Sequence, residues 1–344
     1  MKDEKPTSFD IAHLAGVSQP TVSRALRNSP LVSEETREKI QAIAKKLNYQ
    51  VDINARNLRS KETRTLALLL CEDPGTDDSL INPFFLSMLG SITRASGKMG
   101  YDLLISFQQQ SGDWNADYEN AHRADGIIFL GYGDYITYME KIAHLDRLGA
   151  HFITWGPVLA KQPGHFIGCD NLNSAYLSIK HLTDLDHKKI AFLGIASEHR
   201  PEFNQRYQGY VKALLEAGLI VNPKLQIDAD TSEEMGYEAT IELLKGKLQF
   251  DAIFGASDLI AIGAIKALQE HGKRVPEDVA VVGFDNIPTA SYTNPPLTTV
   301  QQDTKLAGEL LVENILKLIR GEDVSSILMP AKLIIRDSCG ANLS

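Results

Sequence analysis

Long hydrophobic runs are missing from this sequence of 344 residues. The longest uninterrupted apolar stretch, residues 66–71, is far shorter than the roughly 18 residues that a membrane-spanning helix needs. Residues 1–6 are polar and no apolar stretch follows them, so the N-terminus does not resemble a secretory signal. We therefore expect a cytoplasmic protein without a membrane partner.

Cysteine is scarce. Cys71, Cys169 and Cys339 are odd in number and show no Cys-x-x-Cys spacing, which argues against a disulfide framework and against a thiolate zinc site. We expect buried, reduced thiols. The nine histidines have no ligand spacing, so we expect no bound metal.

The common signatures of catalysis are also missing. The chain has no Gly-x-Gly-x-x-Gly, no phosphate loop ending in Gly-Lys-Ser/Thr, no His-Glu-x-x-His and no Gly-x-Ser-x-Gly. Residues 73–76 resemble a kinase phosphate turn only superficially. We expect no catalytic role and no cofactor. The alternative is an enzyme joined to a DNA-binding segment, such as a sugar kinase, and incubation with sugar and ATP would distinguish the two.

Charge is unevenly distributed along the chain. The net charge of −9 argues against a nucleic-acid partner, yet residues 1–64 carry 12 basic and 8 acidic side chains, and the remainder carries −13. A basic segment on an acidic body can approach phosphates while the rest of the protein resists indiscriminate binding.

The first 50 residues predict three short helices. Ser8 can cap the first helix, residues 19–26 form the second with Pro20 in its first turn, and a third follows Ser33 with an apolar stripe. The polar face of the second helix carries side chains that pair with base edges and phosphates. These are Gln19, Thr21, Ser23 and Arg24. The alternative is an ordinary polar surface helix.

A family resemblance appears in the same segment. The strings DIAHLAGVSQPTVSRAL at 10–26, VSEETR at 32–37, LNY at 47–49 and NARNL at 54–58 closely resemble the lactose-repressor (LacI/GalR) family of bacterial transcription regulators. The resemblance implies that Gln19, Pro20 and Arg24 read the major groove. It implies a wider set of contacts to double-stranded DNA by Ser18, Gln19, Pro20, Thr21, Ser23, Arg24, Asn28 and Tyr49.

Residues 52–59 resemble the hinge helix of that family. Leu58 stands where the family places a leucine in the minor groove, and Ala55 permits close approach to the groove floor. Asn54 and Asn57 complete the implied hinge contacts. The family usually has proline after the tyrosine, where this chain has Gln50. The alternative is an ordinary linker in which Leu58 packs on the body.

Beyond the hinge, apolar stretches of strand length alternate with amphipathic helices. The expected strands include 66–70, 103–106, 127–130, 190–193, 252–254 and 279–282. The expected helices include 84–99, 135–148, 173–185, 205–217, 232–244 and 259–271. This alternation predicts an α/β fold of two lobes, each a doubly wound parallel sheet, with a cleft at the carboxyl ends of the strands.

The resemblance extends over this body, which looks like periplasmic sugar-binding proteins. We expect a helix-turn-helix headpiece over 1–50, a hinge and linker over 51–63, and an effector-binding and dimerisation domain over 64–344. The first lobe of that domain would comprise about 64–168 and 301–327, and the second about 169–300 and 328–344.

The resemblance also implies the residues that line the effector cleft. By position these are Asn82, Phe84, Arg206, Ser257, Asp258, Asp285 and Gln302, and Tyr132 and Trp155 follow strands and are candidates for stacking. Carboxylates and guanidinium groups bind hydroxyls strongly, and aromatic rings cover apolar sugar faces. The alternatives are core packing for Phe84, a loop cap for Asp285 and a surface position for Arg206. Ser257 stands where the family usually has asparagine.

Together these patterns favour a dimeric repressor of carbohydrate genes that binds a palindromic operator and is controlled by a sugar. A purine or nucleoside effector is the first alternative. A secreted sugar receptor shares the two-lobed body but would need a signal peptide, and it would have no use for residues 19–24.

Overall fold

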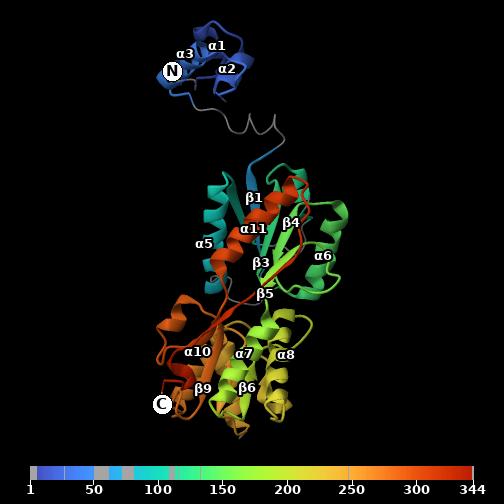
Figure 1. Cartoon of the computed structure of the whole chain (residues 1–344), viewed down its shortest axis with the longest axis vertical. Coiled ribbons are helices and arrows are strands. Elements are labelled where there is room, and N and C mark those ends of the chain that lie inside the picture. The colour runs from blue at the N-terminus through green and yellow to red at the C-terminus, as the bar shows by residue number, and fades with distance from the viewer. Residues whose placement is uncertain are drawn as a thin grey trace. The chain divides into compact units, whose positions relative to one another are not determined.

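The structure is a computed structural model that describes residues 6–26, 28–49, 62–71, 81–107, 113–114, 116–131, 133–246 and 248–342. The chain divides into two compact units, Met1–Thr63 and Arg64–Ser344, which we call the headpiece and the body (Figure 1). Five of the predicted site residues lie outside the described residues. They are Asn54, Ala55, Asn57, Leu58 and Tyr132.

The headpiece contains the three predicted helices: α1 (Ser8–Ala15), α2 (Gln19–Leu26) and α3 (Glu34–Lys46). Thr7, rather than the predicted Ser8, caps α1 in a reciprocal arrangement with Asp10. Gly16 ends α1 at a φ of 69°, a left-handed conformation that glycine adopts at little cost. The three helices pack around a small apolar core formed by Ile11, Ala12, Ala15, Val22, Ala25, Val32, Ile40 and Ala44.

The body contains two six-stranded sheets. The first has the order β11-β5-β4-β3-β1-β2 and the second β12-β10-β9-β8-β6-β7. The strands of the first sheet are β1 (Thr65–Cys71), β2 (Asp102–Phe107), β3 (Gly126–Gly131), β4 (Phe152–Trp155), β5 (Phe166–Cys169) and β11 (Ile327–Met329). Those of the second are β6 (Ile190–Leu193), β7 (Gln226–Ile227), β8 (Ala252–Gly255), β9 (Ala280–Asp285), β10 (Thr298–Gln301) and β12 (Lys332–Ile334).

Helices cover both sheets. The first sheet carries α5 (Pro83–Lys98), α6 (Tyr135–Leu148) and α11 (Thr304–Ile319), and the second carries α7 (Asn171–Asp184), α8 (Pro201–Glu216), α9 (Glu233–Lys245) and α10 (Asp258–Glu270). The helices pack in pairs, α5 with α11, α7 with α8 and α9 with α10. Figure 1 shows α5 and α6 on opposite sides of the first sheet. We call each sheet with its helices the first lobe and the second lobe.

The predicted α/β fold of two doubly wound sheets is confirmed. All strand pairings are parallel except the antiparallel pair of β10 and β12. Buried strands such as β1, β3, β8 and β9 read as continuous apolar runs because helices cover both of their faces. The predicted C-terminal segment of the first lobe ends at about residue 327, whereas β11 stays paired in the first sheet as far as Met329.

The chain passes between the lobes at three places in the described residues: from β5 to α7, from β10 to α11 and from β11 to β12. Short connections of this kind let two rigid lobes move relative to each other about a few backbone positions. All three cysteines are buried thiols that form no disulfide with one another, as predicted. The helices of the described residues are too short or too polar to cross a membrane.

Candidate functional site

The outer face of α2 is the candidate DNA-binding surface. Val22 and Ala25 point into the headpiece core, each fully buried. Because a helix repeats every 3.6 residues, this orientation places Pro20 and Arg24 together on the opposite face, and both are exposed. The helix therefore presents a guanidinium group at a position where a protruding helix can reach base edges.

Three of the predicted contact residues make hydrogen bonds around the start of α2. The Gln19 amide Nε2 donates to Ser8 Oγ at 3.2 Å, and the hydroxyl groups of Ser18 and Thr21 are 2.9 Å apart. The bond from Gln19 to Ser8 joins the start of α2 to α1. An amide group has a second N–H and an oxygen, so Gln19 can keep this bond while it pairs with a base.

The remaining predicted contacts of the headpiece differ in exposure. Asn28 is exposed, has a φ of 55°, and accepts a hydrogen bond from Gln41 at 2.9 Å. Tyr49 is half-buried and packs against the headpiece core, so part of its role is structural. Ser23 lies half-buried on α2 one position before Arg24.

The second lobe brings a buried polar cluster to the carboxyl ends of its strands. Arg206 on α8 is 1% exposed, and its Nε donates to Asn171 Oδ1 at 2.9 Å. Its Nη1 donates to the carbonyl of Ala256 and lies 4.0 Å from Asp285 Oδ1. Gln302 in turn donates to Asp285 at 2.7 Å. The structure therefore joins three predicted residues, Arg206, Asp285 and Gln302, in one network.

Burial dominates the electrostatics of this cluster. Removal from water raises the pKa of Asp285 to about 8, although the nearby Arg206 guanidinium opposes the increase. The guanidinium also stacks on Phe284, with its central carbon 3.8 Å from the ring centroid. Such a rigid, dry arrangement can direct hydrogen bonds toward a ligand with little reorganisation.

Ser257 and Asp258 serve the second lobe itself. Ser257 caps α10 by accepting from the amide of Ile260 at 3.3 Å. Asp258 accepts from the Thr299 hydroxyl at 2.5 Å and from the Ile287 amide at 2.8 Å. Both residues are fully buried, and burial raises the pKa of Asp258 to about 6. Asp258 thereby ties α10 to β10 and to the segment after β9.

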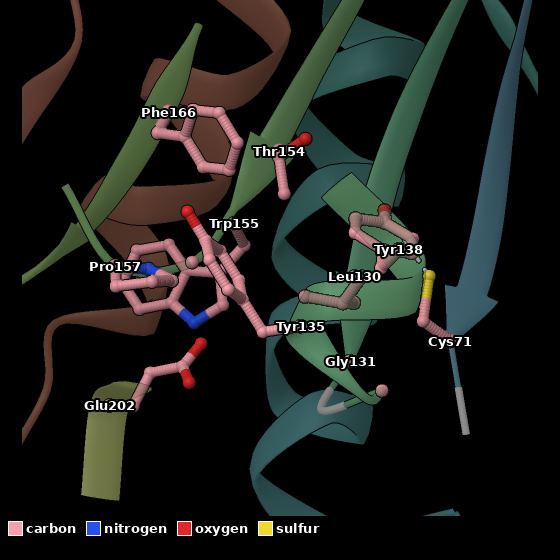
Figure 2. A pocket seen from close by; sticks show the side chains of 12 residues that line it. Cys71, Leu130, Gly131, Tyr135, Tyr138, Thr154, Trp155, Pro157, Phe166 and Glu202 are labelled. Atoms are coloured by element: carbon pink, nitrogen blue, oxygen red, sulfur yellow. Dashed lines mark hydrogen bonds between the residues drawn. The ribbon is translucent and has the colours of Figure 1, made fainter. Parts of the chain in front are cut away.

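The first lobe contributes an aromatic pocket at the same ends of its strands. Figure 2 shows Trp155, Tyr135, Tyr138 and Phe166 around it, with Glu202 of the second lobe on one side. Gly131 ends β3 at a φ of 139°, and a Cβ there would lie 2.1 Å from the carbonyl oxygen of Cys71. Glycine is therefore required where β1 and β3 meet at the pocket.

Phe84 and Asn82 belong to the first lobe near this pocket. Phe84 is 1% exposed and packs on Phe85 and Trp155, with ring centroids 5.3 and 6.1 Å apart. Its geometry favours the core alternative, in which it supports Trp155 from behind. Asn82 caps α5 by accepting from the amide of Phe84 at 2.9 Å.

Direct hydrogen bonds connect the two lobes beside the pocket. His199, before α8, places Nδ1 2.6 Å from Oδ2 of Asp134, which is the N-cap of α6. The backbone amide of Tyr135 donates to the His199 carbonyl at 3.1 Å. The Tyr135 hydroxyl accepts from Gln162 at 3.0 Å, which fixes the ring at the pocket wall.

Three residues of the site were not predicted from the sequence: Glu202, Tyr135 and Asn171. The prediction began the helix near residue 205, whereas α8 begins at Pro201, so Glu202 lies in its first turn. Pro201 was the available signal, since proline is favoured at the first position of a helix. Asn171 lies at the start of α7, and only its contact with Arg206 identifies it.

Comparisons with known proteins agree with this architecture. Residues 9–52 match the family described as bacterial regulatory proteins, lacI family, and residues 179–339 match a periplasmic binding protein-like domain. The transcriptional regulator MalR of Clostridium butyricum is 32% identical over 339 residues, 96% of this chain and 98% of that protein. The transcriptional repressor PurR of Mannheimia succiniciproducens is 30% identical over 338 residues, with the same coverage.

Solved structures give the same result. The lac repressor dimer bound to operator and the anti-inducer ONPF matches with a TM-score of 0.85 and 27% identity, over 98% of this chain and 99% of that one. The complex of the regulator CelR with cellobiose matches with a TM-score of 0.72 and 28% identity, over 97% and 99%. The chain therefore belongs to the LacI family, as a DNA-binding transcriptional regulator with an effector-binding body.

Proposed function

We propose that the protein is a repressor that binds a palindromic operator as a homodimer, and that a carbohydrate bound between the two lobes controls its operator affinity. The observation that carries the proposal is the juxtaposition of the Arg206 cluster and the aromatic pocket at the carboxyl ends of two parallel sheets. Ligands of open α/β sheets bind at that end of the strands.

The chemistry of the two walls supports a carbohydrate. Arg206, Asp285 and Gln302 supply charge-assisted and amide hydrogen bonds of the kind that hydroxyl groups accept and donate. Trp155 and Tyr135 supply the aromatic surface that packs on the C–H face of a sugar ring. The match to a regulator solved with cellobiose points to the same ligand class.

A purine effector is the second candidate. Relatives named PurR are about as similar to this chain as the relative named MalR, and the aromatic rings of the pocket would also stack on a purine. Calorimetric titration of the full-length protein with neutral sugars and with purine bases distinguishes the two candidates. Binding of a purine alone would overturn the carbohydrate assignment.

The first lobe offers a surface for a second copy of the chain. Ile105 and Phe107 are about half exposed on the edge strand β2. They point to the same side of the strand as Leu103, which packs against the main apolar core. Leu86 on α5 and Met99 at its end are also about half exposed. Exposed apolar groups on an uncovered edge mark an association surface. Sedimentation equilibrium should give twice the chain mass of 37.9 kDa.

The DNA-binding role is tested by selecting random double-stranded DNA with the purified protein at near-physiological salt. We expect a palindrome to be enriched. Arg24→Ala should weaken binding to the selected sequence by about 1 to 3 kcal/mol if the guanidinium pairs with a base. Lys45→Ala, an exposed cationic position in the last turn of α3, is the control for loss of charge. Equal affinities of wild type and Arg24→Ala would remove Arg24 from the contact set.

A further inference from the structure

Glu202 is the residue through which the second lobe reaches the aromatic pocket. It lies in the first turn of α8, whereas Tyr135 and Trp155, which line the same pocket, belong to the first lobe. Figure 2 shows its carboxylate directed toward the ring of Trp155. A carboxylate thus lies at the edge of an aromatic surface, which is an arrangement that binds hydrogen-bond donors beside an apolar face.

In the described part of the chain, the carboxylate of Glu202 accepts from its own backbone amide and makes no hydrogen bond or ion pair with another side chain. An acidic residue in a first turn interacts favourably with the helix N-terminus, and it normally does so in water. Glu234, at the same second position of α9, is exposed in this way. Glu202 is instead half-buried, and burial raises its pKa although Arg206 and Arg200 oppose the increase. Interaction with the helix N-terminus does not by itself require a half-buried position, because Glu234 at the same position of α9 is exposed.

The two guanidinium groups that act on Glu202 are held by other groups of the second lobe. Arg200 pairs with Asp230 at 3.1 Å, and Arg206 donates to Asn171 and to the carbonyl of Ala256. The sequence contains no lysine or arginine in residues 65–93 or 99–122, the stretches that include β1, β2 and the segments after them. Lys161, between β4 and β5, is exposed. An anionic group entering the pocket would meet the Glu202 carboxylate, and none of the described residues that line the pocket is a lysine or an arginine.

We propose that Glu202 selects an uncharged, polyhydroxylated effector: its carboxylate accepts hydrogen bonds from ligand hydroxyls while Trp155 and Tyr135 pack on the apolar ring face, and it rejects phosphorylated sugars and nucleotides. This assignment rests on the proposed function, in which the effector binds between the lobes. It adds the charge class of the ligand and the residue that determines it. Like charges brought together in a partly desolvated site repel strongly, so a single carboxylate suffices for the discrimination.

The test is calorimetry of the full-length protein with matched ligand pairs. The probes are glucose with glucose 6-phosphate, sucrose with sucrose 6-phosphate, cellobiose and maltose with their phosphorylated forms, and hypoxanthine with inosine monophosphate. We expect the neutral member of a bound pair to bind at least about tenfold more tightly than its phosphorylated partner. Glu202→Gln should weaken the neutral ligand about tenfold and should reduce the preference over the phosphorylated one. Glu234→Gln removes the same charge from the same position of α9 and should change neither affinity.

Three results would overturn the assignment. The first is equal or tighter binding of the phosphorylated ligand by the wild type. The second is a preference for the neutral over the phosphorylated ligand that stays unchanged in Glu202→Gln. The third is tighter binding of glucosamine than of glucose, which would indicate a cationic ligand. If Glu202→Gln lowers the unfolding temperature, Glu202→Asp keeps the charge and should keep the preference while weakening affinity. Operator binding is measured separately, so loss of palindrome binding would contradict the proposed function without affecting the ligand preference.

Discussion

The two lobes present different chemistry to the space between them. The second lobe contributes a buried polar network in which Arg206 donates to Asn171 and Gln302 donates to Asp285. The first lobe contributes an aromatic wall, with Trp155 supported by Phe84. A polar network supplies direction, and an aromatic wall supplies contact area, so a ligand needs both lobes to bind well. A ligand that binds both walls stabilises one relative arrangement of the lobes, which is the basis of coupling to a distant site.

Removal of Arg206 should have the largest effect on the polar wall. Arg206→Met leaves Asp285 and Asn171 without their buried partner, and we expect a loss of about 3 kcal/mol in the free energy of unfolding together with loss of effector binding. Urea unfolding and calorimetry measure the two effects. Arg274→Met, which breaks an exposed ion pair in the same lobe, should leave both nearly unchanged. Retained effector binding by Arg206→Met would place the ligand elsewhere.

The aromatic wall can be monitored directly because the chain has two tryptophans, Trp114 and Trp155. Trp114→Phe leaves Trp155 as the reporter, and effector should change its fluorescence emission. Trp155→Phe retains Trp114, which packs against Phe129 in an apolar cluster separate from the main core. The fluorescence emission of Trp114 should stay constant when effector is added. We also expect Trp155→Phe to weaken the effector by roughly 1 kcal/mol. A response from Trp114 alone would assign the ligand to a different surface.

The raised pKa of Asp285 predicts how the stability of the second lobe depends on pH. Its pKa moves from the ordinary 3.8 to about 8 on folding, so the folded chain holds a proton that the unfolded chain has already released. The contribution of this group to stability is therefore complete below pH 3.8 and is lost as pH rises toward 8. Asp285→Asn should remove that component, so its stability relative to wild type should increase from pH 5 to pH 8. Parallel pH profiles in urea unfolding would contradict this.

The smallest expected effect concerns the hydrogen bond between the lobes. His199→Ala removes the 2.6 Å contact to Asp134. We expect effector affinity to fall about threefold, because one hydrogen bond that holds the two lobes together is lost and such a bond contributes about 1 kcal/mol. His144→Ala, on the exposed side of α6, is the matched control. If His199→Ala binds effector as tightly as His144→Ala does, the contact plays no part in bringing the walls together.

Local pattern was sufficient to predict most of the fold. The helical period gave α2 and α6 with their observed limits, and continuous apolar runs gave the covered parallel strands. The start of α8 was missed because its N-cap, Arg200, makes no side-chain cap hydrogen bond, so Pro201 alone marked it and no polar cap residue supported that signal. The strands β7, β11 and β12 have two or three residues each, which is too short for a periodic signal.

The site was harder to predict than the fold. The resemblance identified Arg206, Asp285 and Gln302, which the structure brings together from α8, β9 and the segment after β10. It also identified Asp258, whose carboxylate accepts hydrogen bonds from Thr299 and Ile287, both distant in sequence. Glu202 gave no sequence signal, because its significance depends on the first lobe facing it. Pairings across two lobes depend on tertiary structure that no local pattern encodes.

We propose that effector binding in the body changes the affinity of the headpiece for the operator, and operator affinity with and without saturating effector measures this coupling directly. We expect a change of about 5- to 150-fold, with the same factor recovered when effector affinity is measured with and without operator. Arg206→Met should bind the operator and show no change on addition of effector. An operator affinity that stays constant as the wild-type protein is saturated with a ligand bound at Trp155 would contradict this coupling.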